Sequence, residues 1–270
     1  MRAVFKMTSS PEKVAENVLS LTGLLLGVRP EGHLVCDEIE IFPGGAALVR
    51  EDNALVVADM HLGCEASLEH QGMSIPRVQT RKIGEYMRRM IDAIEPSKVI
   101  VAGDLKHNFS RNLNQEWQDV YEFVKTLSGR APLEVVKGNH DNYLGLILRE
   151  YGVPLLREMR SGSVRILHGH EGSLTGGLTV MGHIHPSIRL RDAVGASLKD
   201  HCFLYNRELR VLVLPALSIV SPGTDVVGQD SSDSISPLLA ETGLSGFVPI
   251  AFSGDKALRF PTVGELRASR

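Results

Sequence analysis

Five short motifs rich in Asp, Asn and His stand out between positions 59 and 185. They read DMH from 59, GDLKHN from 103, GNHD from 138, HGH from 168 and GHIH from 182. Neutral imidazoles, carboxylates and an amide suit borderline divalent ions such as Mn, Fe, Zn or Ni better than Ca or Mg. None of the motifs contains a cysteine, which argues against a structural zinc site. The motifs therefore predict a site for divalent metal ions.

The spacing within two of the motifs supports this prediction. Asp59 and His61 are two positions apart, as are His183 and His185, so on an extended segment both partners would face the same side. Each motif alone also has an ordinary explanation: a chance pair, a tight turn at 138–141, or a buried histidine pair. The occurrence of all five in one chain favours a common metal site.

Each motif directly follows, or nearly follows, a short apolar run. The runs cover 54–58, 99–102, 133–136, 164–167 and 178–181 and are rich in Val, Ile and Leu, as buried strands are. Segments with helical character, 77–94 and 115–127, separate the first three runs, so we predict an α/β fold. In open α/β sheets, ligands bind beyond the carboxyl ends of the strands, where the motifs could converge.

The remaining segments suggest the organisation of the chain. Residues 1–30 are expected to be an N-terminal helical extension, in which Ser10 would cap a helix and Pro11 would lie in its first turn. Residues 31–220 would form the core, beginning with a hairpin from 38–41 and 44–49. A Ser/Asp-rich loop is expected over 221–245, and a C-terminal hairpin over 246–270 would complete the core.

Composition excludes several classes of protein. The chain has 270 residues, of which 43% are hydrophobic and 23% charged, which argues against general disorder. A net charge of −3 provides no overall positive field to attract nucleic acid or anionic membranes. The longest early apolar stretch, 19–28, is too short to span a bilayer. The three cysteines Cys36, Cys64 and Cys202 show no pairing pattern, so we expect reduced thiols and a cytoplasmic protein without membrane association.

Together the five motifs resemble the complete signature of the calcineurin-like metallophosphoesterase superfamily, over about 59–186. The stretches 58–63 and 103–107 more specifically resemble a prokaryotic, chiefly archaeal subgroup. That subgroup is related to the SbcD-type nucleases and includes DNA-ligase-associated phosphoesterases. The resemblance implies a single domain with a four-layer αββα sandwich, in which two mixed β-sheets are flanked by helices.

The resemblance also implies a role for individual residues. A first metal ion would be held by Asp59, His61 and His185, a second by Asn139, His168 and His183, and Asp104 would bridge both. His140 would face the substrate and protonate the leaving oxygen, since imidazole exchanges protons near neutral pH. Asp141 would either orient the His140 ring or cap a turn.

Three further polar residues lie next to these motifs. His107 occupies a position where many superfamily members have Asp, Asn108 follows it, and His170 is a spare histidine. Each would contact the substrate or support the metal ligands. The implied activity is hydrolysis of phosphodiester or phosphomonoester bonds by a metal-activated hydroxide, with two divalent ions, Mn being preferred over Fe, Zn or Ni.

Three functions remain open for such a site. The first is a Mn-dependent nuclease acting on DNA or RNA and linked to DNA repair. It would use a local basic strip formed by Arg77, Arg81, Lys82, Arg88 and Arg89, with Lys106 beside Asp104. The second is a phosphodiesterase or phosphatase for small molecules. The third is a non-catalytic metal-binding scaffold, which the complete set of ligands disfavours. The sequence does not indicate the oligomeric state.

Overall fold

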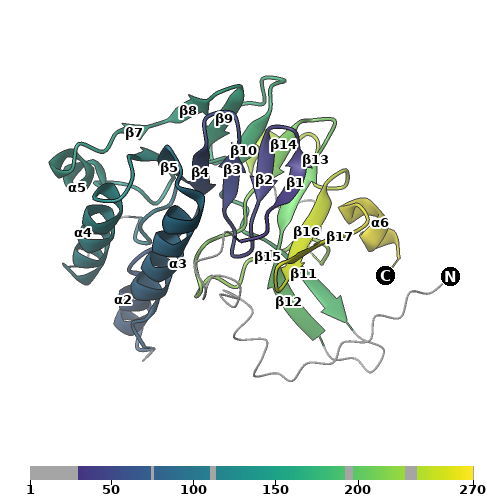
Figure 1. Ribbon diagram of the computed structural model, residues 1–270. Helices are drawn as coiled ribbons and strands as arrows, with labels where there is room; N and C mark the ends of the chain where they lie inside the picture. The colour runs from purple at the N-terminus through teal and green to yellow at the C-terminus, as the bar shows by residue number, and fades with distance from the viewer. Residues whose placement is uncertain (1–29, 74–75, 110–113, 192–196, 229–235, 270) are drawn as a thin grey trace.

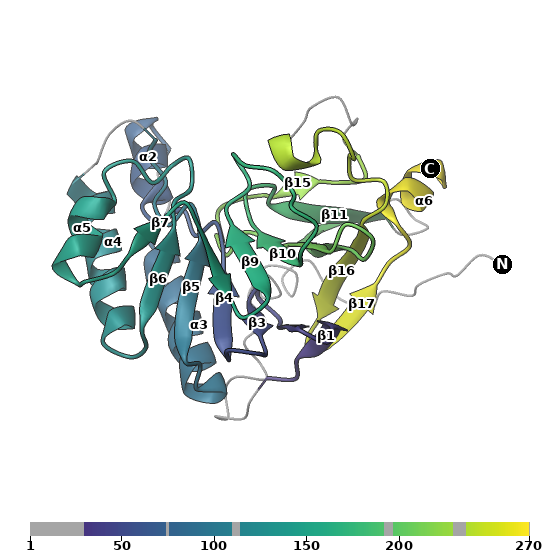
Figure 2. The ribbon, with the colours of Figure 1, turned by 90° about the horizontal axis from the view of Figure 1, so that it is seen from above.

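Two seven-stranded β-sheets packed face to face form the centre of the fold (Figures 1 and 2). The structure is a computed structural model that describes residues 30–73, 76–109, 114–191, 197–228 and 236–269. The helix expected to begin near Ser10, and residues 229–235 of the Ser/Asp-rich segment, lie outside the described residues.

The first sheet has the order β1 to β7 and contains the strands that precede the first three motifs. Its strands are β1 (His33–Cys36), β2 (Ile39–Ile41), β3 (Ala47–Val49), β4 (Ala54–Val57), β5 (Lys98–Ala102), β6 (Leu133–Val136) and β7 (Leu155–Leu156). The strands from β1 to β4 pair antiparallel, whereas β4 to β7 pair parallel. The carboxyl ends of β4, β5 and β6 therefore lie at one edge of the sheet.

The second sheet has the order β17-β16-β13-β14-β10-β9-β8 and contains the strands of the last two motifs. Its strands are β8 (Glu158–Ser161), β9 (Val164–Leu167), β10 (Thr179–Met181), β13 (Phe203–Asn206), β14 (Val211–Val213), β16 (Val248–Ser253) and β17 (Lys256–Arg259). Strands β9, β10 and β14 are parallel to one another. Side chains of both sheets, among them Val56, Ile100, Ile166 and Val180, form the apolar layer between them.

The two outer faces are covered differently. Helices α3 (Gln79–Ile94), α4 (Asn114–Ser128) and α5 (Gly145–Glu150) lie on the first sheet and contribute to its outer core, and α2 (Cys64–His70) contacts α4. The second sheet is covered by α6 (Val263–Ala268), the 3₁₀ turn η2 (Pro237–Leu239) and a small sheet of β12 (Ser197–His201), β11 (Pro186–Arg191) and β15 (Thr224–Asp225). The predicted fold class of two large mixed sheets flanked by helices is confirmed.

The boundaries of most predicted elements agree with the structure within two residues, whereas the strand expected over 44–49 covers only Ala47–Val49. The predicted helix over 77–94 begins at Gln79 because the Glu65 carboxylate accepts hydrogen bonds from the N–H groups of Val78 and Gln79. Helix α6, which follows the terminal hairpin, was not predicted; a capping box of Thr262 and Glu265 starts it. None of the described helices is long and apolar enough to cross a membrane.

Candidate metal centre

The five motifs converge where the carboxyl ends of strands from both sheets meet. The first group of potential ligands comprises Asp59, His61, Asp104 and His185, whose ligand atoms all lie within 4.8 Å of one another. His61 Nε2 and His185 Nε2 are 3.2 Å apart, and His185 Nε2 is 3.4 Å from Asp59 Oδ1. These atoms face a common point that one divalent ion could occupy.

A second group lies beside the first and shares Asp104 with it. Asp104, His168 and His183 also have ligand atoms within 4.8 Å of one another. His168 Nε2 is 3.4 Å from Asp104 Oδ2, 3.2 Å from His183 Nδ1 and 3.1 Å from Asn139 Oδ1. A carboxylate common to two neighbouring groups is in a position from which it could bridge two ions, the role that the resemblance implies for Asp104.

The backbone at the ligands differs from the prediction of extended segments, which was wrong. Five of the ligands have a left-handed backbone, with φ of 55° at Asp59, 48° at His61, 51° at Asp104, 71° at His183 and 49° at His185. Such conformations are unfavourable for residues other than glycine. They persist here because neighbouring backbone holds them: the N–H groups of Asp59 and His61 donate to Gly103 O and Asp104 O, both at 3.0 Å.

Two glycines permit the close approach of the ligand loops. A Cβ atom at Gly138 would lie 2.1 Å from Asp104 Oδ1, and one at Gly182 would lie 2.6 Å from Asp59 Oδ2. Neither distance is compatible with a side chain unless the carboxylate moves. The glycines of the GNHD and GHIH motifs therefore leave the space that the carboxylates occupy.

The ionised carboxylates at the site favour the binding of cations. Burial opposes ionisation of Asp104, but the hydrogen bond and charge of His168 hold its pKa below the ordinary value. Burial likewise opposes a charge on His168, yet the carboxylates of Asp104 and Asp59 raise its pKa to about 9. Burial and neighbouring imidazoles lower the pKa of His61 to about 3 and that of His183 to about 4. The cluster thus combines ionised carboxylates, a His168 imidazolium that would give up a proton to bind an ion, and the neutral imidazoles of His61 and His183, which keep a free lone pair.

The donor set fits divalent metal ions. Asp59 Oδ1 is buried and has no hydrogen-bond partner in the described part of the chain. In each group, two imidazole nitrogens face each other at 3.2 Å. Two N–H groups in that position would repel each other, so at most one nitrogen of each pair carries a proton. His168 Nδ1, 3.0 Å from Ala102 O, must carry a proton because a carbonyl only accepts, so Nε2 is the nitrogen that would present a lone pair to an ion once the ring has lost its second proton.

His140 lies at the open side of the cluster. Its backbone N–H donates to Asp104 Oδ1 at 2.9 Å, and its Nδ1 contacts the carbonyl oxygen of His107. Because a carbonyl only accepts, Nδ1 carries a proton and Nε2, 3.9 Å from Asp104 Oδ2, is the ring atom that can exchange one. The side chain is 29% exposed, so a substrate can reach it.

Asp141 acts on backbone rather than on the His140 ring. Its Oδ2 accepts hydrogen bonds from the N–H groups of Gly138 and Asp104 at 2.8 and 2.9 Å, and Oδ1 accepts from that of Lys106 at 3.3 Å. Of the two roles that the sequence left open, these contacts correspond to the turn-bracing one. None of these contacts involves the His140 imidazole, so they do not support a catalytic role for Asp141 through that ring.

The three remaining candidates lie around the cluster at different depths. The His107 ring stacks near His140, with centroids 5.8 Å apart, and lies edge-on to His61 at 5.5 Å. The His170 ring is 5.2 Å from His168, on the side of the second group. Asn108 contributes backbone contacts, and its Nδ2 is buried without a partner in the described part of the chain. Of the three, His107 lies closest to the exposed His140.

Sequence reasoning missed several residues that hold the site. Glu116, only 1% exposed, accepts hydrogen bonds from the N–H groups of His107 and Asn108. Gln79 is fully buried and contacts backbone on both sides of the metal centre. A signal for Gln79 was available, since a polar residue four positions before Ile83 lies on the buried stripe of α3.

The comparisons with known proteins agree with this geometry. Residues 53–199 match the family described as calcineurin-like phosphoesterase, and the chain belongs to that family. The family depends on two metal ions, and the chain is accordingly a metal-dependent hydrolase of phosphoester bonds. The crystal structure of Pseudomonas putida nuclease MPE is similar, with a TM-score of 0.57 and 17% identity over 82% of this chain and 94% of that one. No curated protein matches the sequence significantly.

Proposed function

We propose that the chain hydrolyses phosphodiester bonds in nucleic acid, with Asp59, His61 and His185 at one metal position, Asn139, His168 and His183 at the other, and Asp104 between them. The observation that carries this proposal is the position of His140. Its imidazole is exposed beside the shared carboxylate, with Nδ1 fixed by the His107 carbonyl. An imidazole so placed can deliver a proton from Nε2 to the leaving oxygen of a diester.

The bound ions and the other residues of the site would have separate roles in the hydrolysis. When bound, two divalent ions supply neutralisation of the phosphate charge and acidify water near neutral pH. Asp104 fixes the spacing between the two positions, since it belongs to both groups. His140 Nε2 protonates the oxygen that departs, and His107, stacked beside it, contacts the same side of the substrate. We expect Mn to be the preferred ion because the motifs resemble those of Mn-dependent nucleases; the donor set itself suits Mn, Fe, Zn or Ni.

Nucleic acid is favoured as the substrate by two lines of support. The similar structure is titled a nuclease, and the motifs at 58–63 and 103–107 resemble those of SbcD-related and DNA-ligase-associated phosphoesterases. The basic strip on α3 contributes less than expected, because Arg77 pairs with Glu69 and Arg81 with Glu85. Lys106 is only 2% exposed, and its ammonium donates to Asn108 O, so it is not a surface contact for phosphate.

A substrate comparison tests the proposal. Metal-stripped protein, then protein with added MnCl₂, would be assayed with bis(p-nitrophenyl) phosphate, p-nitrophenyl phosphate, and single- and double-stranded DNA. We expect Mn-dependent cleavage of the diester and of DNA. In His140→Ala, kcat should fall ~10²–10⁴-fold, because the proton donor is lost while the ligands remain.

Two outcomes would redirect the proposal. Cleavage of small diesters with complete indifference to DNA would favour a small-molecule phosphodiesterase. Protein that binds two ions but cleaves no phosphoester would contradict catalysis and favour a metal-binding scaffold. Equal metal uptake by wild type and His140→Ala is the control that separates the loss of a proton donor from the loss of the metal centre.

A further inference from the structure

The segment after β14 lies against the loops that carry two ligands of the first group. Leu217 N–H donates to Ala58 O at 3.0 Å, next to Asp59, and Thr224 N–H donates to His185 O at 2.7 Å. The sequence identified this segment only as a loop beginning with Ser221-Pro222-Gly223. In the structure it connects the end of β4 with the GHIH motif.

Gln79 joins this segment to the backbone of His61. Its Nε2 donates to His61 O at 2.8 Å and to Met60 O at 3.2 Å. Its Oε1 accepts from Ser218 Oγ at 2.8 Å and from Val220 N–H at 3.3 Å. The carbonyls can only accept and the N–H can only donate, so one orientation of the buried amide satisfies every partner.

Ser221 continues the connection to a ligand imidazole. Its N–H donates to Ser218 Oγ at 3.2 Å, and its own Oγ is 3.3 Å from His185 Nδ1. The other ring nitrogen of His185 faces Asp59 and His61. If that Nε2 is to bind an ion, Nδ1 must carry the proton, and Ser221 Oγ is the acceptor that lies within reach of it.

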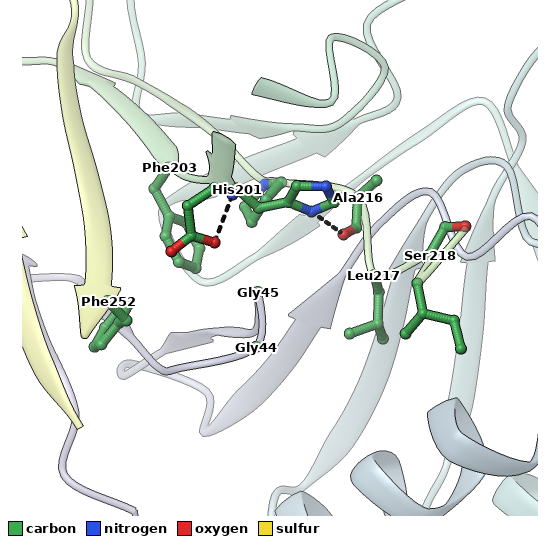
Figure 3. Close-up of a pocket in the computed structure, with 11 residues that line it drawn as sticks. Gly44, Gly45, His201, Phe203, Ala216, Leu217, Ser218 and Phe252 are labelled. Atoms are coloured by element: carbon green, nitrogen blue, oxygen red, sulfur yellow. Dashed lines mark hydrogen bonds between the residues drawn. The ribbon is translucent and has the colours of Figure 1, made fainter. Parts of the chain in front are cut away.

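His201 holds the same segment from the opposite side. Its Nδ1 is 3.2 Å from Ala216 O, and its Nε2 is 3.1 Å from Ser221 O. Figure 3 shows His201 reaching the Ala216 carbonyl at the wall of a pocket that Gly44, Gly45 and Phe252 also line. Both carbonyls only accept, so a neutral His201 ring, with one N–H, donates to one of them at a time. Together with the bond from the Ser221 N–H to Ser218 Oγ, this contact restricts the position of Ser221.

We propose that Ser221 is a positioning residue for His185 and that Gln79, through Ser218, couples it to His61. This inference rests on the metal centre proposed above. The Gln79–Ser218–Ser221 connection touches His61 and His185, which belong to the first group, and among the described residues none of its hydrogen bonds reaches His168, His183 or Asn139. Its loss should weaken one metal position and leave the other nearly unchanged.

Calorimetric titration of the metal-stripped protein with MnCl₂ tests the inference. In Ser221→Ala, we expect one of the two binding events to weaken ~10–100-fold, the usual effect of removing a group that orients a ligand. Ser221→Thr keeps the hydroxyl and should restore most of the affinity. Ser187→Ala is the matched control, because the Ser187 hydroxyl is buried nearby without a hydrogen-bond partner in the described part of the chain.

Gln79→Leu provides a second variant of similar volume. It removes the amide that contacts His61 O and Ser218, so the same binding event should weaken. Unchanged affinities in Ser221→Ala, or equal weakening of both events together with a lower melting temperature, would overturn the inference. The proposed function is tested separately: wild-type protein that binds two ions but cleaves no phosphoester would contradict hydrolysis and leave the inference about Ser221 intact.

Discussion

Asp141 Oδ2 lies 2.9 Å from the backbone nitrogen of Asp104, the carboxylate common to both groups of ligands. The same oxygen is 2.8 Å from the backbone nitrogen of Gly138. One buried carboxylate therefore ties the loop after β5 to the loop after β6. The position of Asp104 depends on a residue that does not itself face the metal centre.

Replacing this carboxylate should destabilise the protein. In Asp141→Ala, the N–H groups of Asp104, Lys106 and Gly138 lose their acceptor, at about 1–3 kcal/mol for each donor left buried. Relief of the repulsion between Asp141 and Asp104 offsets part of this effect. We expect urea denaturation of metal-stripped protein to show a loss of about 2–4 kcal/mol in unfolding free energy.

Asp92→Ala is the matched control for this prediction. Asp92 pairs with Arg130 on the surface at 2.9 Å, with side chains 62% and 40% exposed. An exposed pair contributes less than about 1 kcal/mol, so this variant should unfold nearly as wild type does. Similar losses in both variants would show that Asp141 has no special bracing role.

Two glycine substitutions should change different properties: Gly138→Ala should lower the affinity for Mn, and Gly84→Ala should raise the free energy of unfolding. Gly138→Ala places a methyl group 2.1 Å from Asp104 Oδ1, so the shared carboxylate must move and Mn binding should weaken at both positions. Gly84→Ala, inside α3, meets nothing within 4 Å and should stabilise the helix by about 0.5–1 kcal/mol. Calorimetric Mn titration and urea denaturation distinguish the two. Undiminished Mn binding by Gly138→Ala would contradict the close packing described.

Much of the fold could be predicted because many of its strands are short runs in which Val, Ile and Leu predominate. The runs at 133–136 and 164–167 coincide with β6 and β9, whose buried Val, Ile and Leu side chains define them. Strands β11 and β12 were missed, since β11 alternates arginine with apolar residues and β12 contains a single apolar residue, Leu198. The sequence offered no comparable signal for the left-handed backbone at His61 and His185, which depends on hydrogen bonds from other loops.

Glu116 should affect turnover without being a ligand. It holds the His107 and Asn108 N–H groups, and the His107 carbonyl in turn fixes the His140 ring. In Glu116→Ala, we expect kcat for bis(p-nitrophenyl) phosphate to fall about 10-fold or more as His140 loses its orientation. Glu116→Gln keeps an acceptor oxygen and should retain more activity. Reduced Mn binding in Glu116→Ala would instead place its effect at the metal centre.

Asp200 should make stability depend on pH. Its carboxylate accepts the His201 N–H at 2.8 Å, but burial raises its pKa from 3.8 to about 6. The folded protein then binds this proton more tightly than the unfolded chain does, so the Asp200 contribution to unfolding free energy declines as pH rises from about 4 to 6. Asp200→Asn cannot ionise and retains the acceptor.

The comparison with Asp200→Asn isolates this effect from other titrating groups. Between pH 4.5 and 7.5, wild type should lose about 2 kcal/mol of unfolding free energy relative to the variant. Chemical denaturation of metal-stripped protein at both pH values measures the difference. An equal change in the two proteins would mean that the Asp200 carboxylate is solvated in the folded state.

The supporting residues were harder to predict than the ligands for a physical reason. The candidate ligands are recognisable as clusters of Asp, Asn and His at strand ends, whereas Gln79, Ser221 and Glu116 are isolated polar residues that act through hydrogen bonds to distant segments. Glu116 has the sequence context of an ordinary charge at the start of a helix. Only the tertiary structure shows that it is buried against the loop that orients His140.

The left-handed backbone at the candidate metal ligands lowers the stability of the folded protein, although the side chains at these positions are the ones proposed to bind the ions. At Asp59, His61, Asp104, His183 and His185, glycine would relieve about 1 kcal/mol or more of conformational strain at each position while removing a ligand. Selection for thermal stability alone, applied to a library of this protein, would therefore favour glycine at His61, His183 and His185, whereas Asp59 and Asp104 accept hydrogen bonds from backbone N–H groups that glycine would leave without an acceptor. Engineering for stability that ignores the ion would act against the three histidines of the proposed metal site.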